Sequence, residues 1–421
     1  MKLNYKRTFL VGLAFMTIGS FWQLYDGIVP LILKNTFGVS DSITGIVMAA
    51  DNILALLLLP LFGALSDKTS TRMGRRMPFI LTGTLVTVVG MMFIPISDNM
   101  RSLTLFVIAL GITLLATSTY RSASVALMPD VTPKPLRSKA NAVINLMGAV
   151  GGIFALLAVG ILVPKGESPN YITVYAIVAV FMLVAVLVLV FKIRERDLVQ
   201  NLDDQVREEK ARKSSEVMPA DVKRSFYFIL TSVFLWFMGY NAITTAFSRY
   251  AQVYWGLEGG VFAYTLIVAQ VAAILAFIPV GILASRLGRK KTILGGIILL
   301  VIAFGSAALF RNFSTMLFFI FALAGVGWAS INVNSYPMVV EMSRSADVGK
   351  YTGIYYTFSM SAQIVTPILS GLLLQHVGYW TLFPYGTLFA LMAFATMLFV
   401  KHGDSKPEPV KNIDAYESMD D

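Results

Sequence analysis

Three charged side chains lie inside long apolar stretches of this sequence, and they are the residues best placed to do chemistry: Asp26, Asp51 and Arg121. A charge within an apolar helix in lipid costs about 2.5–3.5 kcal/mol, so these residues are expected to bind an ion, carry a proton or contact a polar ligand. The chain has no cysteine, which excludes disulfides, thiol catalysis and a cysteine-ligated metal, and its two histidines, His376 and His402, are too few for a multi-histidine metal site. We therefore predict neither a metal site nor a catalytic residue.

Asp26 belongs to the stretch "FWQLYDG". Trp22 and Gln23 lie four and three residues before Asp26, which places all three on one helix face. An aromatic ring, an amide and a carboxylate together suit a hydroxyl-rich ligand such as a sugar, because sugars stack C–H faces on rings and hydrogen-bond through hydroxyls. The alternative is an aromatic belt at a membrane interface.

Asp51 belongs to the stretch "GIVMAADNILALLLLP" and precedes Asp67 by 16 residues, which is about 24 Å along a helix. Such a position is too deep for a surface acid. Apolar surroundings favour the neutral form of a carboxyl, so this residue is predicted to bind a cation or carry a proton, with the proton favoured. Asp26 is the second candidate for cation coupling.

Arg121 precedes Asp130 by nine residues, which is about 13–14 Å along a helix. An arginine at this depth needs a partner, either a ligand or a buried acid, and the alternative is a structural pair with a neighbouring helix. Further candidates for a polar ligand lie in the second half of the chain: Trp328, Asn332, Tyr355 and Gln363.

The elements that must position these residues are long apolar runs. The chain has 421 residues, of which 56% are hydrophobic and only 14% charged, and its mean hydropathy is +0.71. Runs of about 20 residues can cross a bilayer, and backbone groups in lipid must bond within a helix. The predicted spans are 8–33, 41–65, 77–97, 102–128, 137–163, 171–193, 222–250, 258–284, 291–310, 313–341, 348–375 and 377–400.

Most of the 34 lysines and arginines fall in segments on one side of these spans. The positive-inside rule then places both termini in the cytoplasm of a cell, with the chain in the cell membrane. The net charge of +10 is read as this orientation signal, so nucleic-acid binding is not predicted.

The charged stretch 194–221 separates two sets of six spans. The predicted organisation is an N-terminal half (1–193), a cytoplasmic linker (194–221), a C-terminal half (222–402) and a disordered cytoplasmic tail (403–421).

The two halves repeat a pattern. "GALSDKTSTRMGRRMPF" at 63–79 matches "GILASRLGRKK" at 281–291, and 128–142 aligns with 339–353 without a gap. Two six-helix halves related by a parallel repeat are an architecture of transporters, and the predicted fold is all-α and integral to the membrane.

The turn at 63–79 contains one acid among bases. Asp67 ends the second span, and Arg75 and Arg76 precede the third. Pairs between these charges are predicted to form a conformational latch; the alternative is a simple positive-inside anchor. Two acids at span ends, Asp130 and Glu341, are predicted to act as gate or capping residues.

This turn resembles the signature of the major facilitator superfamily, and its lengthened form, ending in "GRRMP", is similar to that of the glycoside–pentoside–hexuronide:cation symporters and the plant-type sucrose:proton symporters. The resemblance implies twelve helices and cation-coupled sugar transport. Two departures matter. The melibiose-type sodium symporters carry further acids at the positions of Ala55 and Leu59, and the plant sucrose symporters carry their fourth-helix arginine at the position of Val125.

The resulting prediction is a proton-coupled symporter for a glucoside such as maltose or sucrose, not an enzyme, with a small-molecule substrate and the lipid bilayer as its partners. No cofactor and no obligate protein partner are predicted; the coupling ion is H⁺, with Na⁺ the alternative. A drug or metabolite exporter of the same fold and a non-transporting receptor are the other possibilities. The absence of a Walker-type phosphate loop speaks against direct use of ATP.

Overall fold

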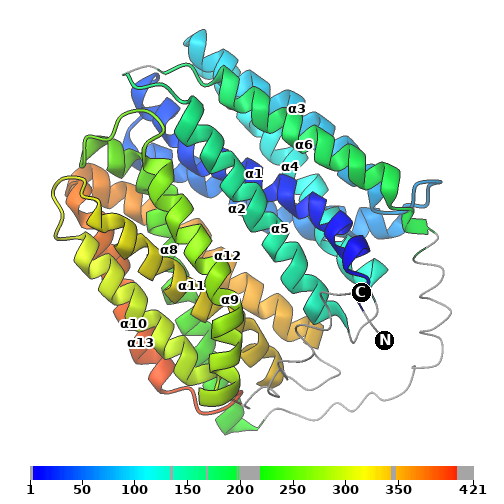
Figure 1. Ribbon diagram of the computed structural model, residues 1–421, viewed down its shortest axis with the longest axis vertical. Coiled ribbons are helices and arrows are strands. Elements are labelled where there is room, and N and C mark those ends of the chain that lie inside the picture. Colours follow the sequence, from blue (N-terminus) through cyan, green and yellow to red (C-terminus); the bar gives the residue numbers. More distant parts are fainter. Residues whose placement is uncertain are drawn as a thin grey trace. The chain divides into compact units, whose positions relative to one another are not determined.

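The computed structural model describes residues 3–132, 136–166, 169–196, 198, 219–342 and 348–404. Within these ranges, twelve helices are long and apolar enough to cross a membrane, which confirms the predicted number of spans. Most of the predicted linker and tail lies outside the described residues. The helices are α1 (Tyr5–Asn35), α2 (Asp41–Lys68), α3 (Met77–Asn99), α4 (Leu103–Val131), α5 (Arg137–Leu162), α6 (Ile172–Lys192), α8 (Ala220–Val253), α9 (Phe262–Leu287), α10 (Arg289–Ala307), α11 (Met316–Met342), α12 (Val348–His376) and α13 (Leu382–Leu398), with a short 3₁₀ turn, η3 (Tyr379–Thr381), before the last (Figure 1).

The chain divides into two compact units. Unit 1 comprises Met1–Ala211 and Phe247–Ile267, and unit 2 comprises Arg212–Ala246 and Val268–Asp421. The boundaries therefore fall inside α8 and inside α9, so the last turns of α8 and the first turns of α9 belong with the first six helices.

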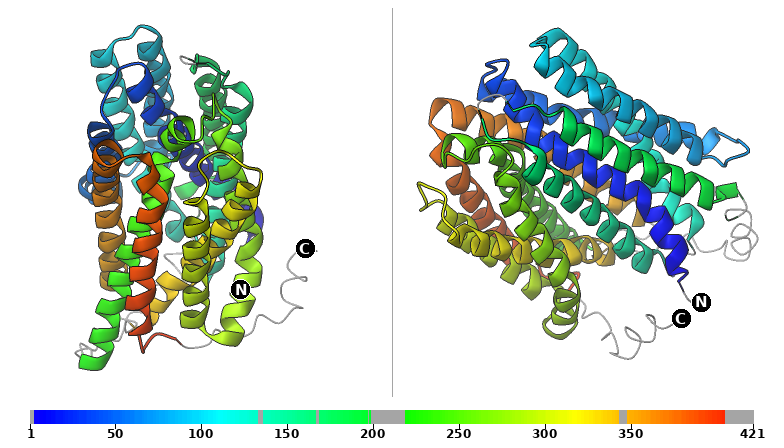
Figure 2. Two further views of the ribbon diagram at one scale, coloured as in Figure 1. Left: turned by 90° about the vertical axis from the view of Figure 1, so that its left-hand side faces the viewer. Right: turned by 45° about the horizontal axis from the view of Figure 1, so that its top comes forward.

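In unit 1, α1 packs most extensively against α5, and α3 packs against both α4 and α6 (Figures 1 and 2). Glycines allow the close approach of α1 and α5. A Cβ added at Gly151 would lie 2.0 Å from the carbonyl oxygen of Met16, and one at Gly19 would lie 2.0 Å from that of Gly148. The Ser20 hydroxyl donates a hydrogen bond to the Gly151 carbonyl at 2.9 Å, so the two backbones are in direct contact.

Buried apolar side chains complete the core of unit 1 near the turn between α2 and α3. This core draws on α1, α3, α4, α5 and α6, and its members include Val11, Ile80, Leu127, Ile144 and Leu189. The charged turn is therefore fixed to a packed set of helices.

Glycines also allow two helices of unit 2 to pack closely. The helix α10 packs mainly against α11 and α13. Gly296 of α10 and Gly327 of α11 face each other, because a Cβ on either would approach the carbonyl oxygen of the other within 2.7–2.8 Å.

Candidate substrate and coupling site

An aromatic and charged cluster in unit 1 gathers residues from α1 and α4. The rings of Trp22 and Tyr25 meet edge to face at 5.5 Å. The guanidinium carbon of Arg121 lies 5.5 Å from the centroid of the Trp22 ring, a cation–π distance. The structure thus brings together Trp22 and Arg121, which are 99 residues apart in the sequence.

Asp51 on α2 joins this cluster from a third helix. It is 8% exposed, and the neighbouring Asn52 amide donates hydrogen bonds to both carboxylate oxygens, at 2.9 and 3.0 Å. The positive charge of Arg121 acts on Asp51, and Asp51 and Asp26 lie close enough to repel each other electrostatically. The three charges that stand out in the sequence therefore share one electrostatic environment.

Two residues of this cluster escaped the sequence analysis. Tyr25 is 2% exposed, donates its hydroxyl to the Val47 carbonyl at 3.0 Å and lies in the electrostatic field of both acids. Asn52 fixes the Asp51 carboxylate. The sequence does hold one signal for these two residues, because Tyr25 directly precedes Asp26 and Asn52 directly follows Asp51. Gln23 and Asp26 are both half-buried on α1.

In unit 2, Trp328 of α11 stacks on Tyr240 of α8 with ring centroids 3.7 Å apart and planes 3° from parallel. Phe237 meets the same indole edge to face at 5.3 Å. Asn332 follows one turn further along α11 and is half-buried. These residues form a flat aromatic surface with an amide one turn away.

Tyr355 and Gln363 on α12 have local partners. Tyr355 is 5% exposed and its hydroxyl lies 3.0 Å from that of Ser335 on α11. The Gln363 side chain donates to the Ser359 carbonyl of its own helix at 3.3 Å. Both residues therefore also hold helices in place.

The predicted latch residues of the first half form one cluster, which we call the turn cluster: Asp67, Arg75, Arg76 and Asp130. Arg76 is 5% exposed; it pairs with Asp67 and places its Nε 2.8 Å from Asp130 Oδ2. Arg75 Nη2 lies 2.8 Å from Asp130 Oδ1. The cluster joins the ends of α2 and α4 to the start of α3.

Glu195 adds an acid to this region that the sequence analysis had assigned to the linker. Its carboxylate is fully buried and accepts hydrogen bonds from the backbone N–H groups of Arg75 at 3.0 Å, Arg76 at 2.9 Å and Met77 at 2.9 Å. The first N–H groups of a helix have no partner within the helix, and the helix dipole favours negative charge there. Glu195 therefore caps α3 from the end of α6.

The second half has a reduced version of this arrangement. Arg289 pairs with Glu341, and the Asp404 carboxylate accepts the backbone N–H of Lys290 at 2.7 Å at the start of α10. Ser285 stands where the first half has Asp67, and its hydroxyl donates to the Ile282 carbonyl of its own helix at 2.7 Å. The cap is repeated, whereas the aspartate of the turn is not.

A buried ion pair lies at the opposite end of α2. Arg249, in the last turns of α8, is 1% exposed, and its Nη1 lies 3.0 Å from Asp41 Oδ1. Lys34 of α1 approaches Asp41 Oδ2 at 3.1 Å. The sequence analysis had not singled out any of the three.

Within the described residues, twelve helices that can cross a membrane, six in each half, together with buried charges, define a membrane transporter and not an enzyme. The chain belongs to the Major Facilitator Superfamily, whose sequence profile matches residues 11–277 and 255–417.

Relatives and solved structures agree with this assignment. The chain is 28% identical over 142 residues to sucrose transport protein SUC3 of Arabidopsis thaliana; the match covers 29% of this chain and about a quarter (24%) of that protein. The fold resembles the inward-open xylose transporter XylE from E. coli (TM-score 0.70, 14% identity, 98% of both chains). It also resembles the nucleoside transporter NupG (TM-score 0.69, 15% identity, 95% of this chain and 100% of that one). At sequence identities of 14% and 15%, the likeness to these two structures establishes the fold of this chain and nothing about its substrate.

Proposed function

We propose that this protein is a proton-coupled sugar symporter that works by alternating access. The observation that carries the proposal is the cluster in unit 1, where an aromatic ring, an arginine and a buried carboxyl from three helices lie within one electrostatic environment. Rings and charged hydrogen-bonding groups are what a sugar requires, and a buried carboxyl is what a proton requires.

Each predicted residue has a role in this proposal. In unit 1, Trp22 is proposed to offer a flat face to the C–H groups of a sugar, and Trp328 is a separate candidate for such a contact in unit 2. Arg121 donates hydrogen bonds to its hydroxyls through a planar fork. The remaining polar candidates contribute further hydrogen bonds: Gln23, Asp26, Asn332, Tyr355 and Gln363.

Asp51 is the proposed proton carrier, with Asp26 as the second candidate. When Asp51 is ionised, it attracts Arg121. When it is protonated, this attraction is lost and the arginine is available to the sugar, so the charge state of Asp51 biases ligand binding. The positions of Ala55 and Leu59 offer no further carboxylates for a sodium site, which favours H⁺ over Na⁺.

The sugar class, a glucoside such as maltose or sucrose, is supported by the likeness to sucrose transport protein SUC3. The distribution of lysine and arginine supports a location in the cell membrane with both termini in the cytoplasm. The turn cluster and the Arg289–Glu341 pair are proposed to stabilise one conformation and to open in the other.

The test is uptake of a labelled panel of glycosides into proteoliposomes, with an imposed pH gradient, an imposed sodium gradient or neither, and with protein-free vesicles as the control. We expect accumulation of a glucoside driven by the pH gradient alone. Accumulation driven only by sodium would contradict proton coupling, and the absence of uptake or exchange for every sugar would contradict the sugar assignment.

A further inference from the structure

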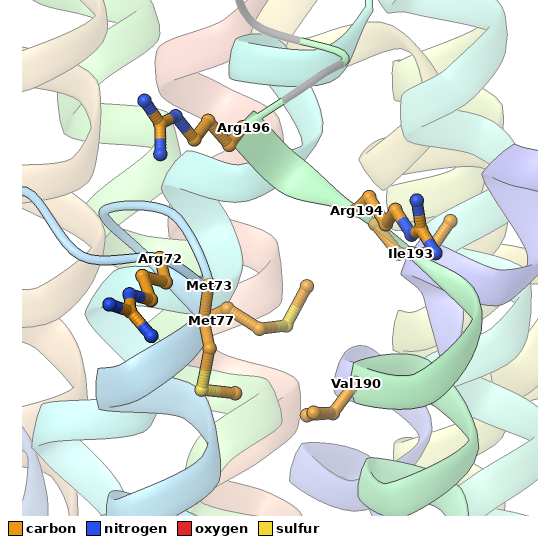
Figure 3. A pocket seen from close by; sticks show the side chains of 7 residues that line it. All are labelled: Arg72, Met73, Met77, Val190, Ile193, Arg194 and Arg196. Atoms are coloured by element: carbon orange, nitrogen blue, oxygen red, sulfur yellow. The ribbon is translucent and has the colours of Figure 1, made fainter.

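A pocket of about 530 Å³ lies in unit 1 where α3 begins and α6 ends, and Arg72, Arg194 and Arg196 are among its lining residues. Figure 3 shows these three side chains directed away from one another, so they do not converge on a common ligand. Polar groups do converge elsewhere in unit 1, where the amide of Asn52 meets the carboxylate of Asp51 on α2. This contact bears on which cation the site accepts.

The Asn52 amide occupies both oxygens of the Asp51 carboxylate. Its Nδ2 donates a hydrogen bond to Oδ1 at 2.9 Å and to Oδ2 at 3.0 Å. Asp51 is 8% exposed and Asn52 is 9% exposed, so water has little access to either side chain. The ionised carboxylate is therefore satisfied by a donor that the chain itself supplies.

A second Asp–Asn pair in the sequence does not make this contact. Asp98 and Asn99 are also adjacent, at the end of α3. There the Asn99 Nδ2 donates to Asn170 Oδ1 at 3.4 Å and turns to a neighbouring loop. The contact between Asn52 and Asp51 is therefore a product of the fold around it, and the second pair offers a matched control.

The charged and titratable groups that act on Asp51 come from the two helices packed against α2. Helix α1 contributes Tyr25 and Asp26, and α4 contributes Arg121. Asp26 opposes a negative charge on Asp51 and Arg121 favours it, so these two influences act in opposite directions. The group that is bonded to both carboxylate oxygens, Asn52, therefore has a large part in deciding what Asp51 can bind.

We propose that Asn52 is a positioning residue that makes Asp51 selective for a proton over a metal cation such as sodium, an inference that rests on the role proposed for Asp51 above. A hard metal cation needs the carboxylate oxygens as ligands, and the amide N–H groups already occupy them. When a proton binds one oxygen instead, the carboxyl gains an O–H donor, and the amide can rotate to accept it on its own oxygen. Asn52 thus satisfies both charge states of Asp51, and the proton needs no added volume.

Difference infrared spectroscopy of the full-length protein in detergent tests the proton part of this inference. A protonated carboxyl group has a C=O stretching band that an ionised one lacks, and the titrating band that is missing in Asp51→Asn belongs to Asp51. Asn52→Leu removes the amide at similar size. We expect it to move the midpoint of this band by about one to two pH units toward alkaline pH, because the ionised carboxylate loses its donor. Asn52→Ser keeps a hydroxyl donor and is expected to move the midpoint less.

The sodium part is tested on the same band, in sodium chloride and in choline chloride of equal ionic strength. We expect no effect of sodium on the wild type. In Asn52→Asp a second carboxylate replaces the amide donor, and sodium is expected to displace the proton and weaken the band. Asn99→Leu and Asn99→Asp are the matched controls and are expected to behave as the wild type. Thermal unfolding checks that every variant is folded.

An unshifted midpoint in folded Asn52→Leu would overturn the role of Asn52, and so would a wild-type band that sodium weakens. A band in Asn52→Asp that sodium leaves unchanged would show that the amide is not what excludes the metal cation. A wild type without a titrating Asp51 band would overturn the inference together with the proton-carrier role. These measurements use no sugar, so their outcome is separate from the result of sugar uptake in proteoliposomes.

Discussion

Asp51 combines two opposing influences in one carboxyl group. Burial among apolar side chains disfavours its charge, whereas the Asn52 amide and the charge of Arg121 favour it. A group in such a balance can change its protonation state when a conformational change alters either influence. This is the physical requirement for a proton carrier.

The Asp51→Asn variant tests this role, because asparagine keeps the shape of the protonated acid and cannot ionise. We expect it to abolish sugar accumulation driven by a pH gradient while sugar-for-sugar exchange persists. Both fluxes are measured in the same proteoliposomes, with Glu258→Gln, an exposed carboxyl outside the site, as the control. Accumulation that survives in Asp51→Asn would transfer the proposed role to Asp26.

Substitutions of Arg121 separate charge from geometry. Lysine keeps the positive charge near Asp51 but loses the planar fork and its stacking over Trp22. Because a hydrogen bond to a charged group contributes about 1.5–3 kcal/mol, Arg121→Lys is expected to raise the Kd for sugar about 10- to 100-fold while proton coupling remains. Titration calorimetry with the sugar identified by uptake measures this, and an unchanged Kd in both Arg121→Lys and Arg121→Gln would leave the residue a structural role.

The sequence reveals a site residue when its residue type is rare inside an apolar helix. Asp26, Asp51 and Arg121 stand out because a charge there is costly. Tyr25 and Asn52 do not, since tyrosine and asparagine are tolerated in membrane helices for many reasons. Only the fold reveals that the Asn52 amide holds the Asp51 carboxylate and that Tyr25 lies in the electrostatic field of both acids.

The cap on α3 shows how one side chain can fix the end of a helix. The Glu195→Gln variant replaces a buried carboxylate, which accepts hydrogen bonds from three N–H groups, by a neutral amide. We expect this change to lower the free energy of unfolding by about 1.5–3 kcal/mol and to lower Tm. Asp404→Asn, which affects one such bond in the second half, is expected to have a smaller effect. Thermal unfolding in detergent compares the two, and a Tm of Glu195→Gln equal to that of the wild type would contradict the capping role.

The contact between α1 and α5 depends on the missing side chain of Gly151. Gly151→Ala places a Cβ 2.0 Å from a backbone oxygen, and since backbone cannot move aside cheaply, we expect a loss of about 1–3 kcal/mol in stability. Gly111→Ala in α4 is the control, because a Cβ there has nothing within 4 Å. Equal Tm values for the two variants would contradict the tight contact.

At the scale of elements, hydropathy was sufficient to predict the twelve spans, since a span is a local property of about 20 residues. The Glu195 cap was not predictable in the same way. The Glu195 carboxylate and the Arg76 N–H that donates to it are 119 residues apart in the sequence. Nothing within the charged segment after α6 distinguishes Glu195 from the other acids nearby.

At the scale of the molecule, the Asp41–Arg249 pair joins α2 to a helix made 208 residues later. Breaking a buried ion pair typically costs about 3–5 kcal/mol, because one charge loses its partner while still out of water. We expect Asp41→Asn and Arg249→Gln each to destabilise the protein by this order, and the double variant to lose less than the sum. Lys34→Gln, whose side chain is 29% exposed, is expected to cost less than about 1 kcal/mol.

Chemical or thermal unfolding of the wild type and the four variants in one detergent gives this comparison. Additive losses in the double variant would show that the two side chains stabilise the protein independently of each other.

The fold as a whole says less about the substrate than the site does. A xylose transporter and a nucleoside transporter resemble this chain almost equally, with TM-scores of 0.70 and 0.69. A shared fold hosts many substrates, so the choice of a sugar rests on the residues around Asp51 and Arg121.

The caps on α3 and α10 also bear on the order in which the protein is assembled during translation. Glu195 is synthesised after every member of the turn cluster, so the ribosome has supplied all of that end of the first half before α8 exists. Asp41 meets Lys34 seven residues before it and has a counter-charge long before Arg249 emerges. The second half receives its corresponding cap only with Asp404, after α13. Since domains tend to fold as they are made, the first six helices can pack against one another before the second six are synthesised. The unit 1 parts of α8 and α9, with the Asp41–Arg249 pair, are added afterwards.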